Sequence, residues 1–277
     1  MNQLYHNTNL KCSKVITNSY STSFSLGIKM LKKEQRPAIY AIYGFVRYAD
    51  EIVDSFHGHD QETLLNEFQE ETFTAIERGI STNPVMHAFQ WAVNEYKIDH
   101  HLIEAFLKSM RFDLTKKGHH QDSYEEYIYG SAEVVGLMCL TVFCKNRAEY
   151  DLLVPSARSL GAAFQKVNFL RDIKADYLDL GRTYFPNVDF NNFTPEDKTQ
   201  IEDDIKKDFD HAFEGIKKLP KEAKFGVYVA YIYYLMLFRK IKNTSHTEVA
   251  EKRIRIPDSK KAFLLFQCYF KYKLRLL

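Results

Sequence analysis

The chain has 277 residues, of which 45% are hydrophobic and 27% are charged, as in a soluble globular protein with a large core. Its formal net charge of +2 argues against a nucleic-acid binder, which normally carries a concentrated basic face. The four cysteines show no metal-ligand spacing, so we expect reduced thiols in a cytoplasmic protein.

Helical periodicity runs through nearly the whole sequence, and no Gly/Ser linker or repeat divides it. We therefore predict one all-α domain over residues 1–277, with antiparallel helices around a central cavity. One helix begins near Pro37, and Pro155 is expected to break or kink another. The other stretches predicted to be helical, with ends uncertain by about 2–4 residues, are 60–80, 84–96, 99–115, 123–144, 147–180, 195–218, 221–242 and 259–275.

The N-terminal segment is polar and lacks the apolar core of a signal peptide. No stretch of the sequence approaches the roughly 18 uninterrupted apolar residues of a membrane span. Ser21 and Ser23, with the backbone around Gly27, could hydrogen-bond a phosphate, although serine clusters more often form turns and helix caps.

The helix predicted after Pro37 carries two carboxylates, Asp50 and Asp54, inside an apolar segment. Residues four apart share a helix face, and like charges at this spacing repel each other. Arg47 precedes Asp50 by three residues and projects near the same face, where its guanidinium could grip a phosphate. For a lone pair of this kind, a solvated helix surface is the usual explanation.

The segment YGSAEVVGLM at 129–138 places small residues at helical spacing. Gly130, Ser131, Ala132 and Gly136 would let either a second helix or a long apolar ligand approach the backbone, and both interpretations stay open. Glu133 is expected at the surface by default.

A second polar stripe runs along an otherwise core-like helix and consists of Gln165, Asn168, Asp172 and Asp176. Buried charge is costly unless it is paired or metal-bound, so two such rows in apolar helices favour a shared cation. Oxygen ligands without a nearby His or Cys favour magnesium. Arg171 is adjacent to Asp172 but is expected to point elsewhere. The Gly-, Pro- and Asn-containing loop that follows can close over a site.

The residues from Glu251 onward hold eight basic and two acidic side chains, a formal charge of +6. Apolar and basic residues alternate at helical spacing in FLLFQCYFKYKLRLL. A peripheral contact with the inner membrane face and a packed terminal helix with a basic outer face are both open.

The sequence resembles the squalene/phytoene synthase family, the head-to-head branch of the trans-prenyl transferases, and within it the bacterial 15-cis-phytoene synthases. The resemblance rests on YADEIVD at 48–54, YGSAEVVGLM at 129–138 and VNFLRDIKADYLDLGRTYFP at 167–186. SYSTSFSLGIKML at 19–31 and RIRIP at 253–257 support it. It implies an all-α isoprenoid-synthase fold, in which two acidic helices at the mouth of an apolar cavity bind Mg²⁺, or Mn²⁺, and hold two prenyl diphosphates.

The resemblance also implies roles for individual residues. The implied metal ligands are Asp50, Asp54, Asn168, Asp172 and Asp176. The implied catalytic residues are Asp50, Asp54, Asp172, Asp176, Tyr129 and Arg171. The implied substrate-binding residues are Ser21, Ser23, Tyr43, Arg47, Gln165, Asn168, Arg182, Tyr184 and Arg253. Either Tyr233 or Tyr234 adds another tyrosine.

The activity implied by the resemblance is condensation of two geranylgeranyl diphosphates to phytoene in carotenoid biosynthesis, without NADPH. A squalene, dehydrosqualene or presqualene diphosphate synthase that uses farnesyl diphosphate is the alternative. A non-catalytic binding subunit is a third hypothesis, disfavoured because both acidic rows are intact. The sequence leaves the chain length of the substrate, product stereochemistry, the number of metal ions, and the choice between monomer and homodimer open.

Overall fold

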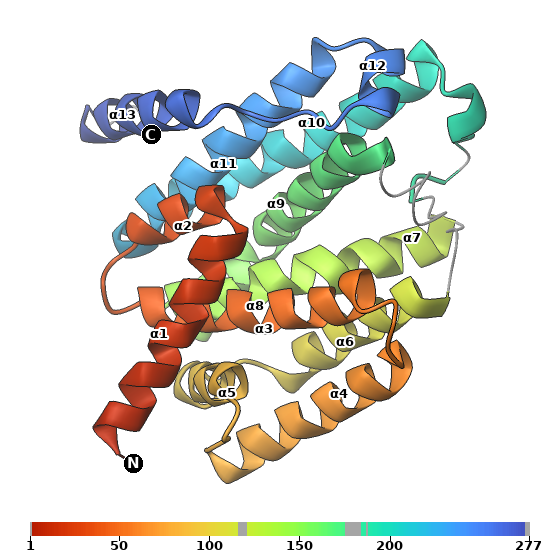
Figure 1. The fold of residues 1–277 in the computed structure, drawn as a ribbon. Coiled ribbons are helices and arrows are strands. Elements are labelled where there is room, and N and C mark those ends of the chain that lie inside the picture. Colours follow the sequence, from red (N-terminus) through yellow and green to blue (C-terminus); the bar gives the residue numbers. More distant parts are fainter. Residues whose placement is uncertain (1, 116–120, 175–183, 187, 275–277) are drawn as a thin grey trace.

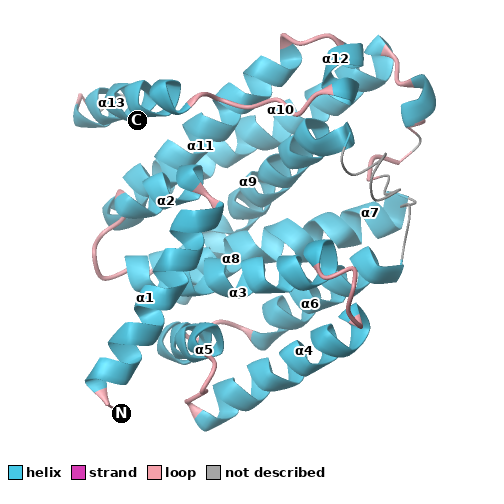
Figure 2. Cartoon of the chain, in the orientation of Figure 1, coloured by secondary structure: helices cyan, strands magenta, loops and turns pink. Residues whose placement is uncertain are grey.

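The computed structural model describes residues 2–115, 121–174, 184–186 and 188–274, and within these ranges the chain forms helices without a β-strand (Figure 2). A short 3₁₀ turn, η3, spans Phe190–Asn192. The α-helices are α1 (Gln3–Tyr20), α2 (Thr22–Lys29), α3 (Arg36–Ser55), α4 (Gln61–Arg78), α5 (Pro84–Tyr96), α6 (His100–Thr115), α7 (Gln121–Ile128), α8 (Val134–Phe143), α9 (Arg147–Lys174), α10 (Pro195–Lys218), α11 (Lys221–Lys242), α12 (His246–Glu251) and α13 (Asp258–Lys273).

Local sequence signals account for where several helices begin and end. The Asp60 side chain caps α4, and α4 stops at Gly79, whose φ of 68° is the left-handed conformation that glycine adopts without strain. Asn83 caps α5 immediately before a proline in its first turn. Thr194 and Asp197 form a reciprocal capping box at the start of α10.

The predicted helices agree closely with the observed ones, and the all-α prediction is confirmed. Pro155, which was expected to break or kink a helix, does not break α9, which is helical on both sides of it. The N-terminal helix α1 was not among the predicted helices. The reason is that α1 buries small polar side chains, including Ser13 and Thr17, so it lacks the apolar stripe that periodicity detects.

The helices surround a central cavity from several sides (Figure 1). On one side, α1 and α5 pack against α3, and α4 packs against α5. On the other side, α10 packs along α9, and α2 packs against α11. Between these groups, α8 contacts both α3 and α9, so residues far apart in the sequence face one hollow.

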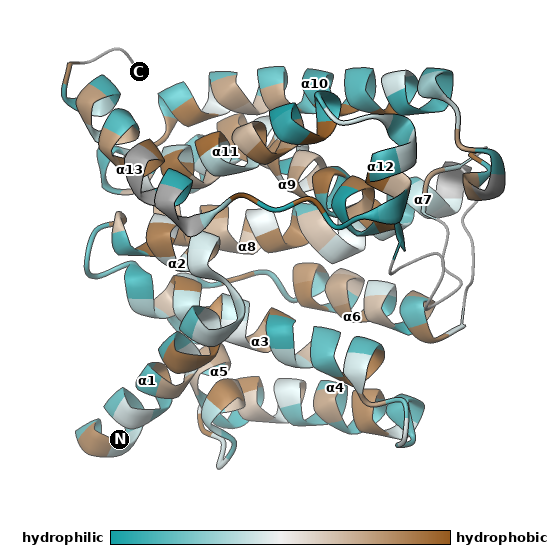
Figure 3. Cartoon of the chain, turned by 45° about the horizontal axis from the view of Figure 1, so that its top comes forward, coloured by the Kyte–Doolittle hydropathy of each residue, from teal (hydrophilic) through white to brown (hydrophobic). Residues whose placement is uncertain are grey.

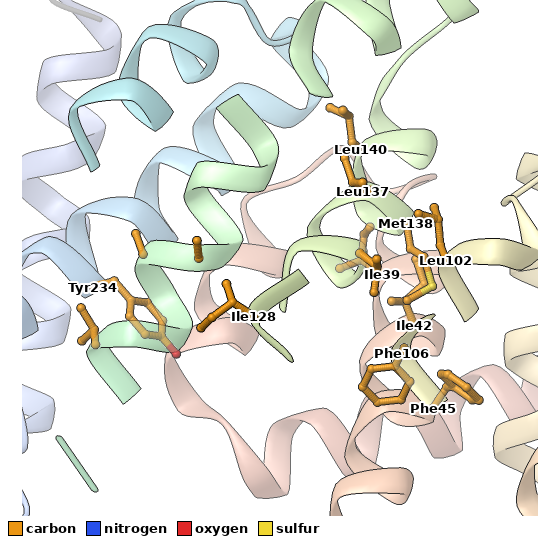
Figure 4. Packing of buried hydrophobic residues seen from close by; sticks show 14 of the residues in the cluster. Ile39, Ile42, Phe45, Leu102, Phe106, Ile128, Leu137, Met138, Leu140 and Tyr234 are labelled. Atoms are coloured by element: carbon orange, nitrogen blue, oxygen red, sulfur yellow. The ribbon is translucent and has the colours of Figure 1, made fainter. Parts of the chain in front are cut away.

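A stack of phenylalanines anchors α3 in the core. Phe45, Phe89 and Phe106 are almost completely buried, and the rings of Phe45 and Phe89 stack with centroids 3.8 Å apart (Figure 4 shows Phe45 and Phe106). Truncation of such a side chain to alanine costs about 3–5 kcal/mol. This packing fixes the rotation of α3, and the Asp50 carboxylate consequently turns toward the cavity.

The helical segment that runs from α7 into α8 is long and apolar. Ser123–Phe143 is, among the described residues, a helix whose length and hydropathy would suffice to cross a membrane. Half of its most apolar window is buried inside the protein, and it contacts α6, α9 and α3. We therefore interpret it as a core helix that lines the cavity.

Candidate active site

A cavity of about 620 Å³ lies between α2, α3, α8, α9, α10 and α11. One end is polar and open to solvent, since Asp54 and Arg253 line it and are exposed. The rest of the wall is apolar and includes buried side chains such as Ile28, Leu140 and Ile216. The polar lining residues are Tyr20, Ser21, Tyr43, Arg47, Asp50, Asp54, Asp113, Tyr127, Ser131, Ser156, Gln165, Asn168, Arg171, Asp172, Tyr184, Tyr234 and Arg253.

The acidic row on α3 faces this cavity, with Arg47 beside it. The Arg47 guanidinium pairs with Glu51, lies 3.8 Å from Asp50, and sits 4.5 Å from the centre of the Tyr20 ring. Its Nε atom is buried and has no hydrogen-bond partner. A buried donor without a partner costs about 1–3 kcal/mol, so this nitrogen is placed to receive an anion.

The folded protein disfavours the ionised form of the Asp50 carboxyl group. Burial, followed by the neighbouring Asp54 and Glu51 carboxylates, raises its pKa to about 7 in spite of the opposing attraction of Arg47. A carboxyl group in this position is poised to lose its proton when a cation arrives. The predicted mutual repulsion along α3 is therefore a property of the folded site.

The acidic row on α9 is paired differently. Asp172 accepts hydrogen bonds from the Arg171 guanidinium at 2.5–3.1 Å, and Arg253 Nε lies 2.7 Å from the same carboxylate. The expectation that Arg171 points elsewhere was wrong, because its long side chain folds back along the helix onto its neighbour. Gln165 and Asn168 also line the cavity, whereas Asp176 and Arg182 lie outside the described residues.

The remaining sequence-predicted residues divide into those that line the cavity and those that do not. Ser21 lines it, caps α2 by accepting from the Phe24 N–H at 3.2 Å, and hydrogen-bonds Tyr43, whose pKa burial raises to about 12. Ser23 is not among the lining residues that the structure describes. Of the two candidate tyrosines, Tyr234 lines the cavity and donates to Asn168 Oδ1 at 3.4 Å.

Tyr127, near the end of α7, lines the cavity. Its hydroxyl donates to both carboxylate oxygens of Asp113 at 2.9 Å, and its ring stacks on Tyr184 with centroids 5.4 Å apart. Tyr129 instead lies under the Arg158 guanidinium, 5.2 Å from its ring centre, and is not a lining residue. Sequence reasoning missed Tyr127 and Asp113, although a carboxylate inside the apolar helix α6 was an available signal.

A change in helical register follows shortly after Tyr127. Residues Tyr129–Glu133 form a π-helical turn, η1, between α7 and α8. Such a turn holds more residues than an α-helical one and shifts the faces of the helix before and after it. Glu133 is consequently not at the surface as expected: its side chain is 13% exposed and pairs with Arg158.

The small residues of this segment serve both of the uses that the sequence left open. A Cβ on Gly130 would lie 2.6 Å from the Ala105 carbonyl oxygen of α6, so this glycine permits close helix packing. Gly136 lines the cavity, where the absence of a side chain leaves room for a ligand, and it also lies against Ala157 of α9.

Aromatic rings form part of the wall near the polar end. Phe164 and Tyr234 stack with centroids 3.9 Å apart, and Phe24 meets both at 6.0–6.1 Å. All three line the cavity. Aromatic faces attract positive charge and exclude water, so this wall suits a cationic intermediate with an apolar chain.

The donor set fits a hard divalent cation in its chemistry. Asp50, Asp54, Asp172 and Asn168 offer oxygen atoms to one cavity, and the raised pKa of Asp50 marks where positive charge is needed. No three acidic, His or Cys side chains within the described ranges are grouped closely enough to hold a metal by themselves. Magnesium commonly binds through one or two carboxylates and completes its shell with phosphate oxygens and water.

Comparison with known proteins identifies the family of the chain. The family model of squalene/phytoene synthases matches residues 17–260. A phytoene synthase from Arthrospira platensis is 29% identical over 90% of this chain and 89% of its own length. A 4,4'-diapophytoene synthase from Staphylococcus haemolyticus is 28% identical over 70% of this chain and 66% of its own. A ligand-bound dehydrosqualene synthase structure superposes with a TM-score of 0.81 at 21% identity, covering 97% of this chain and 98% of that one.

Proposed function

This chain belongs to the squalene/phytoene synthase family and is a prenyltransferase, and we propose that it joins two geranylgeranyl diphosphates head to head into phytoene. The reaction belongs to carotenoid biosynthesis. The observation that carries the proposal is the single cavity, which combines an acidic and arginine-rich open end with an apolar, aromatic interior. A substrate with a diphosphate head and a long hydrocarbon tail needs both parts.

Three arginines and a serine bind the diphosphates in this proposal. Arg47 uses its unpartnered Nε, and Arg171 and Arg253 turn from Asp172 toward the phosphate oxygens. Ser21 offers its hydroxyl from the start of α2. These groups are already desolvated or paired in the cavity, which lowers the entropic cost of ordering them when substrate binds.

The carboxylates are the groups that would hold the metal. Asp50 and Asp54 from α3, with Asn168 and Asp172 from α9, would bind Mg²⁺ or Mn²⁺; Asp176 belongs to this set by its place in the motif. When bound there, such an ion would neutralise the diphosphate oxygens and make diphosphate a better leaving group. The four oxygen-bearing side chains keep the two ionic ends of the substrates on one side of the cavity.

The two half-reactions then occur inside the apolar wall. In the first, the C–O bond of one allylic diphosphate breaks, a cyclopropane forms with the double bond of the second substrate, and diphosphate and a proton leave. In the second, the cyclopropylcarbinyl diphosphate loses its own diphosphate, rearranges, and releases a second proton to give phytoene. Phe24, Phe164 and Tyr234 shield these cations from water, which would quench them.

A farnesyl diphosphate substrate is the second candidate. The similarity to a 4,4'-diapophytoene synthase is nearly as high as that to a phytoene synthase, although it covers less of the chain. The broader coverage by phytoene synthases favours the longer substrate.

The deciding experiment is a product assay. Purified protein with Mg²⁺ is incubated with geranylgeranyl or farnesyl diphosphate, each with and without NADPH, and the extracted hydrocarbons are identified by mass spectrometry. We expect phytoene from geranylgeranyl diphosphate, with a yield that NADPH does not change. Preferred conversion of farnesyl diphosphate would replace this assignment with the second candidate, and no turnover of either would refute both.

A further inference from the structure

The C-terminal helix α13 is attached to the bundle along one face only. It lies at the edge of the molecule beside α11 (Figure 1). Leu264 and Cys268 are buried in this contact, and the Tyr272 ring lies 4.9 Å from that of Phe225 on α11. These residues follow each other at steps of four and define the packed side of the helix.

The opposite side of α13 is apolar and exposed. Phe266 is 59% exposed, Phe270 47% and Leu274, at the end of the helix, 65%. Tyr269, 46% exposed, flanks them, and the rings of Phe266 and Phe270 lie 4.5 Å apart. The other large exposed apolar side chains of the described residues are spread over several elements, and isolated exposed apolar residues are ordinary on soluble proteins.

Positive charge surrounds this apolar stripe. Lys260, Lys271 and Lys273 are exposed on α13 itself. The segment between α12 and α13 adds the exposed Arg253 and Arg255. No acidic residue occurs in the sequence between 259 and 274, so the charged side chains that α13 itself places beside the stripe are all basic.

We propose that α13 is a lipid-contacting helix that seats the protein on an anionic membrane surface. Aromatic and aliphatic side chains enter the boundary between headgroups and acyl chains, while lysines pair with acidic headgroups. A second copy of this chain fits the surface less well, because a symmetric contact would bring Lys271 and Lys273 of each copy against the same cationic border.

The position of α13 relative to the cavity supports this partner. Lys261 Nζ lies 2.7 Å from Thr22 Oγ1, and Thr22 follows Ser21 of the cavity lining. The segment that leads into α13 carries Arg253 to Asp172. The lipid-facing helix starts beside α2 (Figure 3), and Arg253 and Ser21 line the cavity, so a long apolar product could pass into the membrane here if the proposed function holds.

Vesicle co-sedimentation of the full chain, without substrate or metal, tests the surface independently of the reaction. The vesicles contain phosphatidylcholine with or without about one third phosphatidylglycerol. We expect binding to the anionic vesicles, reduced at least about tenfold by the double substitution Phe266→Ser and Phe270→Ser. Leu4→Ser with Leu152→Ser, which removes two leucines of α1 and α9 that are more exposed than the phenylalanines, is the matched control and should bind like the parent.

A charge variant separates lipid attraction from self-association. Lys271→Glu with Lys273→Glu, and likewise high salt, should weaken binding to the anionic vesicles. Equal binding to both kinds of vesicle, or unchanged binding of the Phe266/Phe270 variant, would overturn the proposal. So would a sedimentation-velocity result in which that variant converts a dimer to a monomer without altering vesicle binding. Turnover with detergent-dispersed substrate should be unchanged, because neither phenylalanine lines the cavity.

Discussion

The two acidic helices of the cavity have the same four-residue spacing but opposite electrostatic states. On α3, burial and the neighbouring Asp54 and Glu51 carboxylates raise the pKa of Asp50 to about 7 against the attraction of Arg47, which also pairs with Glu51. On α9, Asp172 lies between two guanidiniums. Asp50 on α3 would therefore gain from a bound cation, whereas Asp172 on α9 already has cations that can pass to a phosphate. The difference suggests that metal and diphosphate binding are divided unequally between the helices.

The largest effect is expected from Asp172, which the proposed metal and both arginines share. Asp172→Asn keeps the size of the side chain but removes the charge, so kcat should fall at least about 100-fold while the fold persists. Steady-state kinetics measures the fall in kcat, and a thermal melt checks that the fold persists. Asp203→Asn, on the exposed face of α10, is the matched control. An unchanged rate in the Asp172 variant would remove that carboxylate from the mechanism.

A smaller effect is expected when one of the two guanidiniums on Asp172 is removed. Arg253→Gln should lower kcat/KM about tenfold, mainly through KM, because the side chain is half exposed and Arg171 remains. Arg255→Gln, two residues along the same segment and outside the cavity lining, should have no effect. A loss in kcat alone, with KM unchanged, would contradict the assignment of Arg253 to substrate binding.

Removal of the unfavourable charge of Asp50 on α3 should stabilise the metal-free protein at high pH. The folded pKa of Asp50, about 7, lies above its ordinary value of 3.8. Its stabilising contribution is therefore complete below about pH 4 and is lost as the pH rises through 7. Asp50→Asn should raise the unfolding free energy of the metal-free protein by about 1–3 kcal/mol at pH 8 and change it little at pH 4, while turnover is lost.

Denaturant titrations at the two pH values measure this prediction. Asp54→Asn, at the exposed end of the same row, should stabilise the protein less. Equal destabilisation of the Asp50 variant at both pH values would show that the carboxylate is satisfied in the folded protein and that the two rows do not differ as described.

The smallest effect is expected at Tyr234, whose hydroxyl donates a long hydrogen bond of 3.4 Å to Asn168. Tyr234→Phe keeps the aromatic wall and should lower kcat/KM about threefold. Tyr234→Leu removes the ring from the stack with Phe164 and should cost more. If the phenylalanine variant were the more impaired of the two, the hydroxyl rather than the ring face would be the important part.

The features that the sequence predicted well are those that the helical backbone determines directly. Residues four apart share a face in any α-helix, so the Asp50 and Asp172 rows could be placed on the cavity before any coordinates. The apolar stripes likewise marked α4 to α11 closely.

The features it did not predict depend on contacts and on departures from helical regularity. A π-helical turn spans Tyr129–Glu133, and no 3.6-residue pattern shows such a shift; Tyr127, and not Tyr129, lines the cavity. Arg171 folds onto Asp172 through a side-chain contact that helical spacing alone does not predict. The helix α1 was missed because its buried face consists of small polar side chains.

The most direct test of the shared site is calorimetric binding of an unreactive geranylgeranyl thiodiphosphate to the parent chain and to the Asp50→Asn and Asp172→Asn variants, each with and without Mg²⁺. If α3 and α9 hold one metal–diphosphate site, the parent should bind tightly only when Mg²⁺ is present, and each substitution on its own should abolish that enhancement. Mg²⁺-independent affinity, or full enhancement in either variant, would show that the two acidic rows do not act on the same ligand.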